Sequence, residues 1–323
     1  MAGESKMKFL ITGVCGFIGS YFAKYVIQKY PEISIIGNDR NANQRNLARL
    51  EDLPKNSRFN LVFKDLARDN FAEEFTDVDY VFNFGAETHV DYSIQNPEPF
   101  IESNIVGTYK LLEEAKRSRT LKTFFQFSTD EVYGAILSGS HTEESPSRPS
   151  NPYAATKESA DALAYSYFKT YGLPVIITRG ENHYGPWQGK EKVFPTFVRK
   201  ALNNEPLPIY GDGKHIRQWL HVDDSAKALM HLIEKGKIGE IYNIGGKQEL
   251  ENLELAKRIL RLLGKPEDMI EFIPDFNIRP GHDRRYALNT EKIEKTGWKP
   301  QWDLNIGISY TVDWYKNNQW WFM

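Results

Sequence analysis

A glycine-rich turn between a short apolar segment and an amphipathic one constrains the fold most. Lys8 to Thr12 predicts a buried strand, Gly13, Gly16 and Gly19 follow in Gly-x-x-Gly-x-x-Gly spacing, and Phe17 to Gln28 has the apolar period of a helix. Glycine is required where a backbone turns tightly, approaches a pyrophosphate and packs a helix against a strand, and the helix N-terminus attracts phosphate. This order of elements predicts a dinucleotide-binding βαβ unit.

A carboxylate at the end of the second predicted strand indicates which dinucleotide binds. Ile33 to Asn38 predicts that strand, and Asp39 follows it, close to the spacing of about 20 residues that this fold shows. The carboxylate accepts hydrogen bonds from ribose hydroxyls and repels a 2'-phosphate, which favours NAD over NADP. Arg40, the next residue, weakens this preference because a guanidinium pairs with that phosphate. The prediction is NAD.

Strands and helices alternate through the first half of the chain. Further strands are predicted at Phe59 to Phe63, Tyr80 to Phe84, Thr123 to Ser128 and Val175 to Arg179, and helices at Asn70 to Phe75, Asn104 to Arg117 and Lys157 to Tyr171. This alternation is typical of an α/β fold with a Rossmann-type doubly wound parallel sheet.

The pattern changes beyond Arg179, where the elements become shorter and richer in proline and glycine, as in Glu205 to Pro208. The change predicts a smaller, mainly C-terminal substrate-binding lobe at residues 180–323. Residues 1–179 form the predicted NAD-binding domain. A helix is predicted at Asp223 to Gly236 and a strand at Glu240 to Gly245. Residues 223–245 are therefore predicted to rejoin the sheet of the NAD-binding domain.

A cluster of polar side chains predicts redox chemistry joined to acid–base chemistry. Thr129, Asp130 and Glu131 follow a predicted strand, and Tyr153 and Lys157 stand four residues apart on one face of a predicted helix. The ammonium stabilises a phenolate, so a tyrosine with an ordinary pKa of about 10 becomes a usable base near pH 7. Carboxylates after a strand are commonly solvated, but here the carboxyl ends of the strands face the ligand. A simple dehydrogenase does not need the two carboxylates.

These residues resemble the extended short-chain dehydrogenase/reductase family, and within it the nucleotide-sugar 4,6-dehydratases of the dTDP-glucose type. The resemblance covers essentially the whole chain. It is carried by residues 13–20, 84–91, 128–134, 151–157, 182–186, 217–222 and 281–286, and Thr129-Asp130-Glu131 is its most specific part.

The resemblance implies a role for each residue of the cluster. Tyr153, with Lys157, removes the proton from the hydroxyl on carbon 4 of a hexose, and Thr129 holds the developing ketone. Glu131 removes the hydrogen on carbon 5, and Asp130 protonates the hydroxyl that leaves carbon 6. The implied product is a 4-keto-6-deoxy sugar.

The resemblance also implies two sets of binding residues and a partner. Cofactor-binding residues would be Gly13, Gly16, Phe17, Ile18, Gly19, Asp39, Asp65, Leu66, Phe84, Ala86, Thr88, Tyr153 and Lys157. Substrate-binding residues would be Glu87, His89, Asn182, Lys192, Val193, Arg217, Asn252, His282 and Arg285. A homodimer would form when the two amphipathic helices near residues 104–117 and 157–171 pair with a second copy as a four-helix bundle.

Several positions around the expected sugar site depart from the dTDP-glucose pattern, among them Tyr92, Glu181, His183 and Trp187. dTDP-D-glucose is the predicted substrate. A UDP- or GDP-linked N-acetylhexosamine is the alternative substrate, since Glu181 could contact an N-acetyl group. A 4-epimerase would use the tyrosine and lysine without the carboxylate pair. The fold would also serve an ordinary reductase or, in a different class of protein, a non-catalytic dinucleotide sensor.

Composition narrows the class of protein. The 323 residues carry a formal net charge of −2 and no long basic run, which argues against a nucleic-acid partner. The apolar runs are strand-length and the N-terminal residues lack an apolar core, so neither a membrane helix nor a signal peptide is predicted. Cys15 is the only cysteine, which suits a reducing cytoplasm. No second His, Cys or acidic residue stands at the helical spacing of metal ligands from His89 or His282, so no metal is predicted. Tyr133 and the tryptophans Trp314, Trp320 and Trp321 are predicted to pack.

Overall fold

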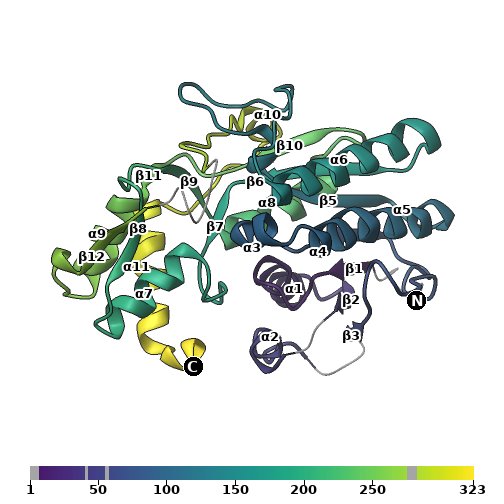
Figure 1. Ribbon diagram of the computed structural model, residues 1–323. Helices are drawn as coiled ribbons and strands as arrows, with labels where there is room; N and C mark the ends of the chain where they lie inside the picture. Colours follow the sequence, from purple (N-terminus) through teal and green to yellow (C-terminus); the bar gives the residue numbers. More distant parts are fainter. Residues whose placement is uncertain (1–6, 41–42, 55–57, 275–281) are drawn as a thin grey trace.

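The computed structural model describes residues 7–40, 43–54, 58–274 and 282–323. Two groups of elements lie side by side (Figure 1): a large sheet with helices on both faces, and a group of small sheets with three helices. The predictions for the N-terminal residues 1–6 and for Gly281 lie outside the described residues. Within the described part, no helix has the length and apolar character that crossing a membrane requires.

A seven-stranded sheet forms the larger group. Its strands are β1 (Lys8–Thr12), β2 (Ser34–Asp39), β3 (Phe59–Phe63), β4 (Tyr80–Asn83), β5 (Thr123–Thr129), β6 (Val175–Gly180) and β10 (Ile241–Ile244). The order is β10-β6-β5-β4-β1-β2-β3, and every neighbouring pair is parallel. The predicted doubly wound sheet is confirmed. Its order reverses between β1 and β4, where this fold opens a ligand crevice.

Successive residues of the central strands point to opposite faces and bury both. Phe9 packs into the core under α1 (Phe17–Lys29), α8 (Val222–Lys235) and α10 (Glu291–Lys295), whereas Leu10 packs into the core under α5 (Gly107–Arg117) and α6 (Pro152–Tyr171). This period of two explains why these strands are apolar at nearly every position. Short helices α2 (Gln44–Ala48), α3 (Val90–Gln95) and α4 (Glu98–Phe100) and a π-helix, η1 (Ile101–Val106), complete this group.

Two helix predictions need correction. Asn70 to Phe75 is a series of turns, because so short a segment is marginal as a helix; the Asn70 side chain accepts the Ala72 N–H at 2.8 Å. The helix predicted from Lys157 begins at Pro152, since Asn151 caps it by accepting the Ala154 N–H at 2.9 Å. The predicted strands are confirmed to within one residue at each end.

The second group has its own core. It contains a three-stranded sheet of β7 (Asn182–Tyr184), β9 (Ile216–His221) and β11 (Glu249–Glu251), and a two-stranded sheet of β8 (Leu207–Tyr210) and β12 (Ile270–Ile273). Helices α7 (Val193–Leu202), α9 (Asn252–Leu262) and α11 (Leu304–Asn317), with the short turns η3 (Glu267–Met269) and η4 (Gln319–Phe322), pack on them. The predicted packing of the terminal tryptophans is confirmed for Trp314 and Trp321, whereas Trp320 is half exposed.

Candidate active site

A cavity of about 630 Å³ extends from the carboxyl ends of the central strands into the second group of elements. The predicted residues that line it are Gly16, Phe17, Ile18, Gly19, Phe84, Ala86, Thr88, His89, Thr129, Asp130, Glu131, Tyr153, Lys157, Asn182, Lys192, Val193, Arg217, Asn252 and His282. A second cavity of about 270 Å³ shares part of this wall and is lined by Gly13, Gly16, Asp39, Asp65, Leu66, Phe84, Ala86 and Glu87. The structure therefore gathers nearly all the predicted site residues.

Arg285 is the exception, because it lines neither cavity. Its guanidinium pairs with the Glu249 carboxylate at 2.8 Å and donates to the carbonyls of Ile136 and Gly139 at 3.2 and 2.9 Å. These partners hold the guanidinium in a structural ion pair. A substrate contact of Arg285 therefore stays a prediction.

The glycine turn leaves the start of α1 open to a phosphate. Gly13 has φ +65°, and a Cβ on Gly19 would lie 2.4 Å from the Gly13 carbonyl oxygen, so a side chain at either position would strain the turn. Among the residues that the structure describes, no side chain caps the N-terminus of α1. Asp39 accepts the Cys15 N–H at 2.9 Å, which fixes its carboxylate beside the turn. These residues fit a dinucleotide, with phosphates at α1 and a ribose at Asp39.

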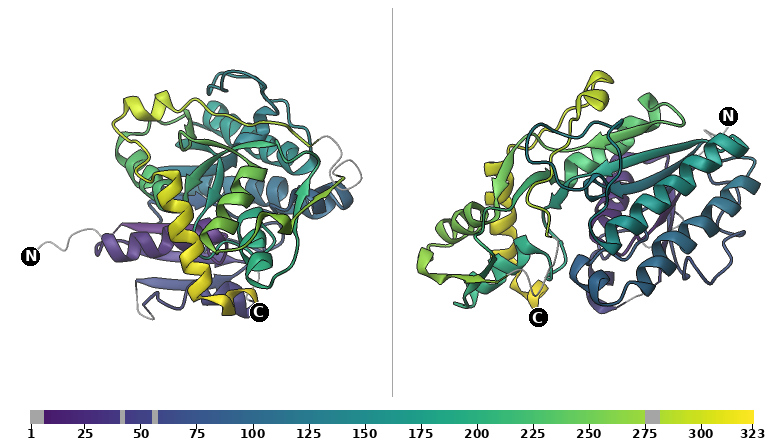
Figure 2. Two further views of the ribbon diagram at one scale, coloured as in Figure 1. Left: turned by 90° about the vertical axis from the view of Figure 1, so that its left-hand side faces the viewer. Right: turned by 45° about the horizontal axis from the view of Figure 1, so that its top comes forward.

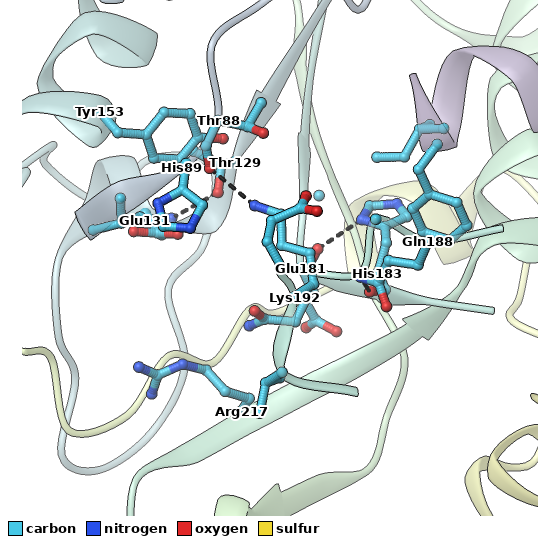
Figure 3. A pocket seen from close by; sticks show the side chains of 18 of the residues that line it. Thr88, His89, Thr129, Glu131, Tyr153, Glu181, His183, Gln188, Lys192 and Arg217 are labelled. Carbon is cyan, nitrogen blue, oxygen red and sulfur yellow. Dashed lines mark hydrogen bonds between the residues drawn. The ribbon is translucent and has the colours of Figure 1, made fainter. Parts of the chain in front are cut away.

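Three catalytic candidates lie where β5 ends and a 3-10 turn, η2 (Asp130–Tyr133), begins. The Thr129 hydroxyl accepts the Glu131 N–H at 3.3 Å and donates to the Asp130 carboxylate at 3.1 Å. The Glu131 carboxylate accepts from the Asn151 amide at 3.1 Å. Figure 3 shows Thr129, Glu131 and Tyr153 close together at one end of the cavity. Tyr133 is buried and donates to Asn243 at 2.9 Å, so its predicted packing role is confirmed.

The two neighbouring carboxyl groups have different environments. Asp130 is buried, and burial followed by the charge of Glu131 raises the pKa of its carboxyl to about 7, against the opposing effects of Arg217 and Thr129. A carboxylic acid that is partly protonated near neutral pH can donate a proton. Glu131 is partly exposed and accepts the amide hydrogen bond from Asn151. The pair can therefore supply an acid and a base.

Tyr153 and Lys157 project from α6 into the same end of the cavity. The Lys157 ammonium donates to the Phe127 carbonyl at 2.7 Å, and burial lowers its pKa to about 8, partly opposed by the charge of Asp161. Burial, then Glu131 and Asp130, raise the pKa of the Tyr153 phenol, whereas a side-chain hydrogen bond with Thr129 lowers it. The phenolate therefore needs positive charge nearby to form.

A buried ion pair lies behind Lys157. Asp161 accepts from the Arg179 guanidinium at 3.0 Å, and Arg179 lies over the Tyr133 ring at 4.6 Å. Asp161 stands one helical turn after Lys157, and its charge raises the Lys157 pKa. The pair links α6 to β6 and places a carboxylate next to the lysine.

Two cations line the cavity at different places. Arg217 donates to the Asp283 carbonyl at 3.0 Å and contacts the His282 ring at 3.1 Å, and Lys192 donates to the Thr88 carbonyl at 3.0 Å. Figure 3 shows Arg217 well separated from Tyr153. A guanidinium at this distance from Tyr153 suits a charged diphosphate, whereas the Lys192 ammonium lies at Thr88, nearer the acid–base cluster.

Two of the departures from the expected pattern, Glu181 and His183, are buried, whereas Tyr92 is 43% exposed. Glu181 accepts the Gly246 N–H at 2.8 Å, and burial, then the charge of Asp130, raise the pKa of its carboxyl well above its ordinary value. Burial lowers the pKa of His183 to about 4, and its ring contacts the Glu181 carbonyl at 2.7 Å. Trp187 packs against Trp314 and Trp321.

The roles of Asn151, Asp161 and Arg179 were missed from the sequence. Asn151 had a detectable signal, because asparagine before proline favours a helix start. Asp161 and Arg179 had none, since their pairing depends on how α6 lies against β6. In the described part of the chain, no group of three or more His, Cys, Asp or Glu residues could hold a metal ion.

Comparison with known proteins agrees with this geometry. Residues 10–311 match the family described as GDP-mannose 4,6 dehydratase. The chain is 44% identical over 313 residues to the low-salt glycan biosynthesis protein Agl12 of Haloferax volcanii, covering 96% of this chain and 98% of that one. It is 42% identical over 325 residues to the dTDP-glucose 4,6-dehydratase of Actinoplanes sp., covering 98% and 100%.

A solved structure shows the same likeness. The crystal structure of DesIV, a dTDP-glucose 4,6-dehydratase from Streptomyces venezuelae, with NAD and TYD bound, superposes with a TM-score of 0.91 at 42% identity over 98% of both chains. The resemblance drawn from the motifs is confirmed. With a match over residues 10–311 and relatives of this identity along nearly the whole length, the chain belongs to the GDP-mannose 4,6 dehydratase family.

Proposed function

We propose that this protein is an NAD-dependent nucleotide-sugar 4,6-dehydratase that converts dTDP-D-glucose to dTDP-4-keto-6-deoxy-D-glucose. The observation that carries this proposal is the meeting of Asp130 and Glu131 with Thr129, Tyr153 and Lys157 at one end of a single cavity. Alcohol oxidation needs only the last three. An acid and a base beside them supply what the loss of water requires.

The first step is oxidation at carbon 4. Tyr153 takes the proton of the carbon-4 hydroxyl, and Thr129 donates a hydrogen bond to the ketone that forms. Bound NAD supplies a hydride acceptor for carbon 4, a hydride donor for carbon 6 and, when oxidised, a positive charge. We assign to Lys157 the role of adding its own positive charge near the phenol, whose pKa burial, Glu131 and Asp130 raise.

The second step is elimination. The ketone makes the hydrogen on carbon 5 acidic, and Glu131 removes it as a base. Asp130, in its protonated form, donates to the hydroxyl that leaves carbon 6 as water. Glu131 then returns its proton to carbon 5 as carbon 6 is reduced. The raised pKa of Asp130 supports this role, because the acid must hold a proton near neutral pH.

A panel of nucleotide sugars tests this function. Incubation with dTDP-glucose is expected to give the 4-keto-6-deoxy sugar, which absorbs in the ultraviolet after alkali treatment, without net use of cofactor. Activity only on a UDP- or GDP-linked N-acetylhexosamine would change the substrate and keep the chemistry. A 4-epimer, or net consumption of cofactor, would overturn the proposed reaction.

We assign the two halves of the cavity to two ligands. Residues 1–179, with 223–245, hold NAD, and residues 180–323 mainly hold the nucleotide sugar. The glycine turn and Asp39 in the first part, and Arg217 and Lys192 in the second, support this division. Hydrogen exchange would test it: an inert dTDP analogue should protect residues of the second part more than NAD does.

The outer face of α5 and α6 supports a homodimer. Figure 2 shows the two helices running side by side along one side of the molecule. Tyr109, Tyr165 and Tyr171 are 45%, 44% and 55% exposed there. We place a second copy on this face as a four-helix bundle. Sedimentation should give a dimer, and Tyr165→Glu should give a monomer, whereas Phe272→Glu, at an exposed position of β12, should leave the dimer intact.

We also place the enzyme in the cytoplasm, which cell fractionation would check.

Purified protein is expected to carry NAD, and Asp39→Ala should lose it. A charge-assisted hydrogen bond contributes about 1.5–3 kcal/mol, so NAD binding should weaken roughly 10- to 150-fold. The measurement is the NAD content after denaturation. Asp52→Ala, which removes a carboxylate paired with Lys24 at the surface, is the matched control and should keep its NAD. Release of NADP(H) alone from the wild-type protein would contradict the assignment.

The rate of oxidation should fall as pH rises through about 8. Lys157 acts as an ammonium, its pKa is lowered to about 8, and the active form is therefore present below this pH. Asp161→Asn removes the charge that raises the Lys157 pKa, so the fall should move to lower pH. Stopped-flow absorbance of NADH measures it. Arg179, which pairs with Asp161, is left unpaired in this variant, so circular dichroism must confirm folding.

Glu158→Gln, on the same helix, is the matched control and should leave the pH profile in place. The position of the fall on the pH axis does not depend on how much protein is folded. A profile of Asp161→Asn that coincides with that of the wild-type protein would show that Asp161 does not act on Lys157.

A further inference from the structure

The proposed reaction requires the cofactor to stay bound through a whole turnover. The hydride that leaves carbon 4 returns to carbon 6 of the same sugar, so a cofactor that dissociates between the two transfers leaves the product unfinished. Closure of a protein around its ligands prevents such a loss. Contacts that join the two groups of elements beside the cavity would supply this closure.

We infer that Arg49, Trp187 and Trp321 hold the two groups of elements together over bound NAD and set the rate at which NAD leaves the enzyme. The three residues form a contact that we call the Arg49 bridge. They are positioning residues, since they act on the segments around the cofactor and not on the reacting atoms. The inference rests on the proposed NAD-dependent reaction.

Arg49 directly follows α2 and joins two distant segments of the chain. Through different nitrogens, its guanidinium donates to the Cys15 carbonyl in the glycine turn at 2.8 Å and to the Trp187 carbonyl at 2.9 Å. It also donates to the Asn46 side chain at 2.9 Å, and it is only 5% exposed. A guanidinium presents several donors in a rigid plane, so one side chain can hold two backbones at once. The glycine turn and the segment after β7 are therefore connected through a single buried residue.

Trp321, in η4, contacts Arg49 from the second group of elements. Its buried ring lies 4.8 Å from the Arg49 guanidinium carbon, within reach of a cation–π contact, and 5.4 Å from the Trp187 ring. Its indole N–H donates to the Gln188 carbonyl at 2.8 Å. Ala48, the last residue of α2, is buried in the core of the second group, and Figure 1 shows α2 and the C-terminus at the same edge of the molecule. Arg49 and Trp321 therefore hold the backbone of residues 187 and 188 from two different elements.

The segment that these contacts hold is part of the cavity wall. Residues 188–193 line the same cavity as Gly16 to Gly19, where the start of α1 faces the phosphates of the dinucleotide. Trp187 has φ +73°, a conformation that bulky side chains rarely adopt, so its surroundings must hold it there. Without the Arg49 bridge, this segment would relax and uncover the cofactor.

Arg49→Met tests the bridge, because methionine keeps much of the apolar length of arginine and removes every donor. Protein loaded with radiolabelled NAD is mixed with excess unlabelled NAD, and the label that stays bound is followed over time without any sugar. A hydrogen bond to a charged group is typically worth about tenfold or more in an equilibrium constant, so the label should leave at least about tenfold faster than from the wild-type protein. Trp321→Phe, which keeps an apolar ring and removes the indole N–H, should also speed the release.

Arg58→Met is the matched control. Arg58 also donates to backbone carbonyls, those of Ile27 and Tyr30 at 3.0 and 2.7 Å, but these lie within the larger group of elements. The control should release NAD at the wild-type rate even if it is less stable. Arg49 also lines the cavity, so Arg49→Lys separates the bridge from a simple attraction of phosphate. An ammonium keeps the charge but lacks the planar set of donors, so Arg49→Lys should release NAD faster than the wild-type protein does.

Release of NAD from Arg49→Met or Arg49→Lys at the wild-type rate would overturn the bridge, as would an equal acceleration in Arg58→Met. Circular dichroism checks that each variant is folded, and Trp321→Phe carries the test if Arg49→Met is not. A wild-type protein that binds no NAD would overturn the proposed cofactor instead, so the two failures are distinguishable.

Discussion

The double variant Asp130→Asn with Glu131→Gln should oxidise carbon 4 and then stop, with NADH accumulating on the enzyme. Both carboxyl groups act only after the ketone has formed, and each amide keeps the shape while it cannot exchange a proton. General acid–base catalysis is typically worth about 10²–10⁴-fold, so formation of the 4-keto-6-deoxy product should fall by at least that factor. Absorbance of bound NADH measures the first half of the reaction, and product analysis measures the second.

Glu144→Gln is the control for this experiment, because Glu144 is an exposed carboxylate on the loop that follows η2. It should behave as the wild-type protein does. If the double variant made product at close to the wild-type rate, the basis for assigning a dehydratase would be gone. If it were folded and made no NADH, the two carboxylates would have a role in oxidation itself.

Tyr153→Phe should block the reaction one step earlier. The change removes the base and alters the volume little, so substrate binding should be almost unchanged while oxidation slows by about 10²–10⁴-fold. No NADH should accumulate, in contrast with the double variant. Single-turnover kinetics with a separate binding measurement resolve the two effects. Tyr165→Phe, at a half-exposed position on the same helix, is the control. A loss of less than tenfold would exclude Tyr153 as the base.

The sequence allowed the large sheet and most of the site to be predicted, because both depend on local rules. A glycine turn between a strand and a helix, and four-residue spacing on one helix, require no knowledge of distant residues. The roles of Arg285 and Asp161 did require it. Arg285 pairs with Glu249, and Asp161 pairs with Arg179 on another element, so packing alone decides what each charge meets. The predicted helix from Asn70 to Phe75 is absent for a local reason, since so short a segment is marginal as a helix.

The position of β10 in the sheet has a consequence for how the chain acquires its structure. β10 pairs with β6, yet residues 182–221, which contain β7, α7, β8 and β9, come between them in the sequence. Until residues 241–244 emerge from the ribosome, β6 is an outer strand with one row of backbone N–H and C=O groups unpaired, the kind of edge on which other chains add. Closing that edge requires a long loop to form first, and such non-local contacts slow folding. The sheet is therefore completed only after much of the second group of elements has been synthesised.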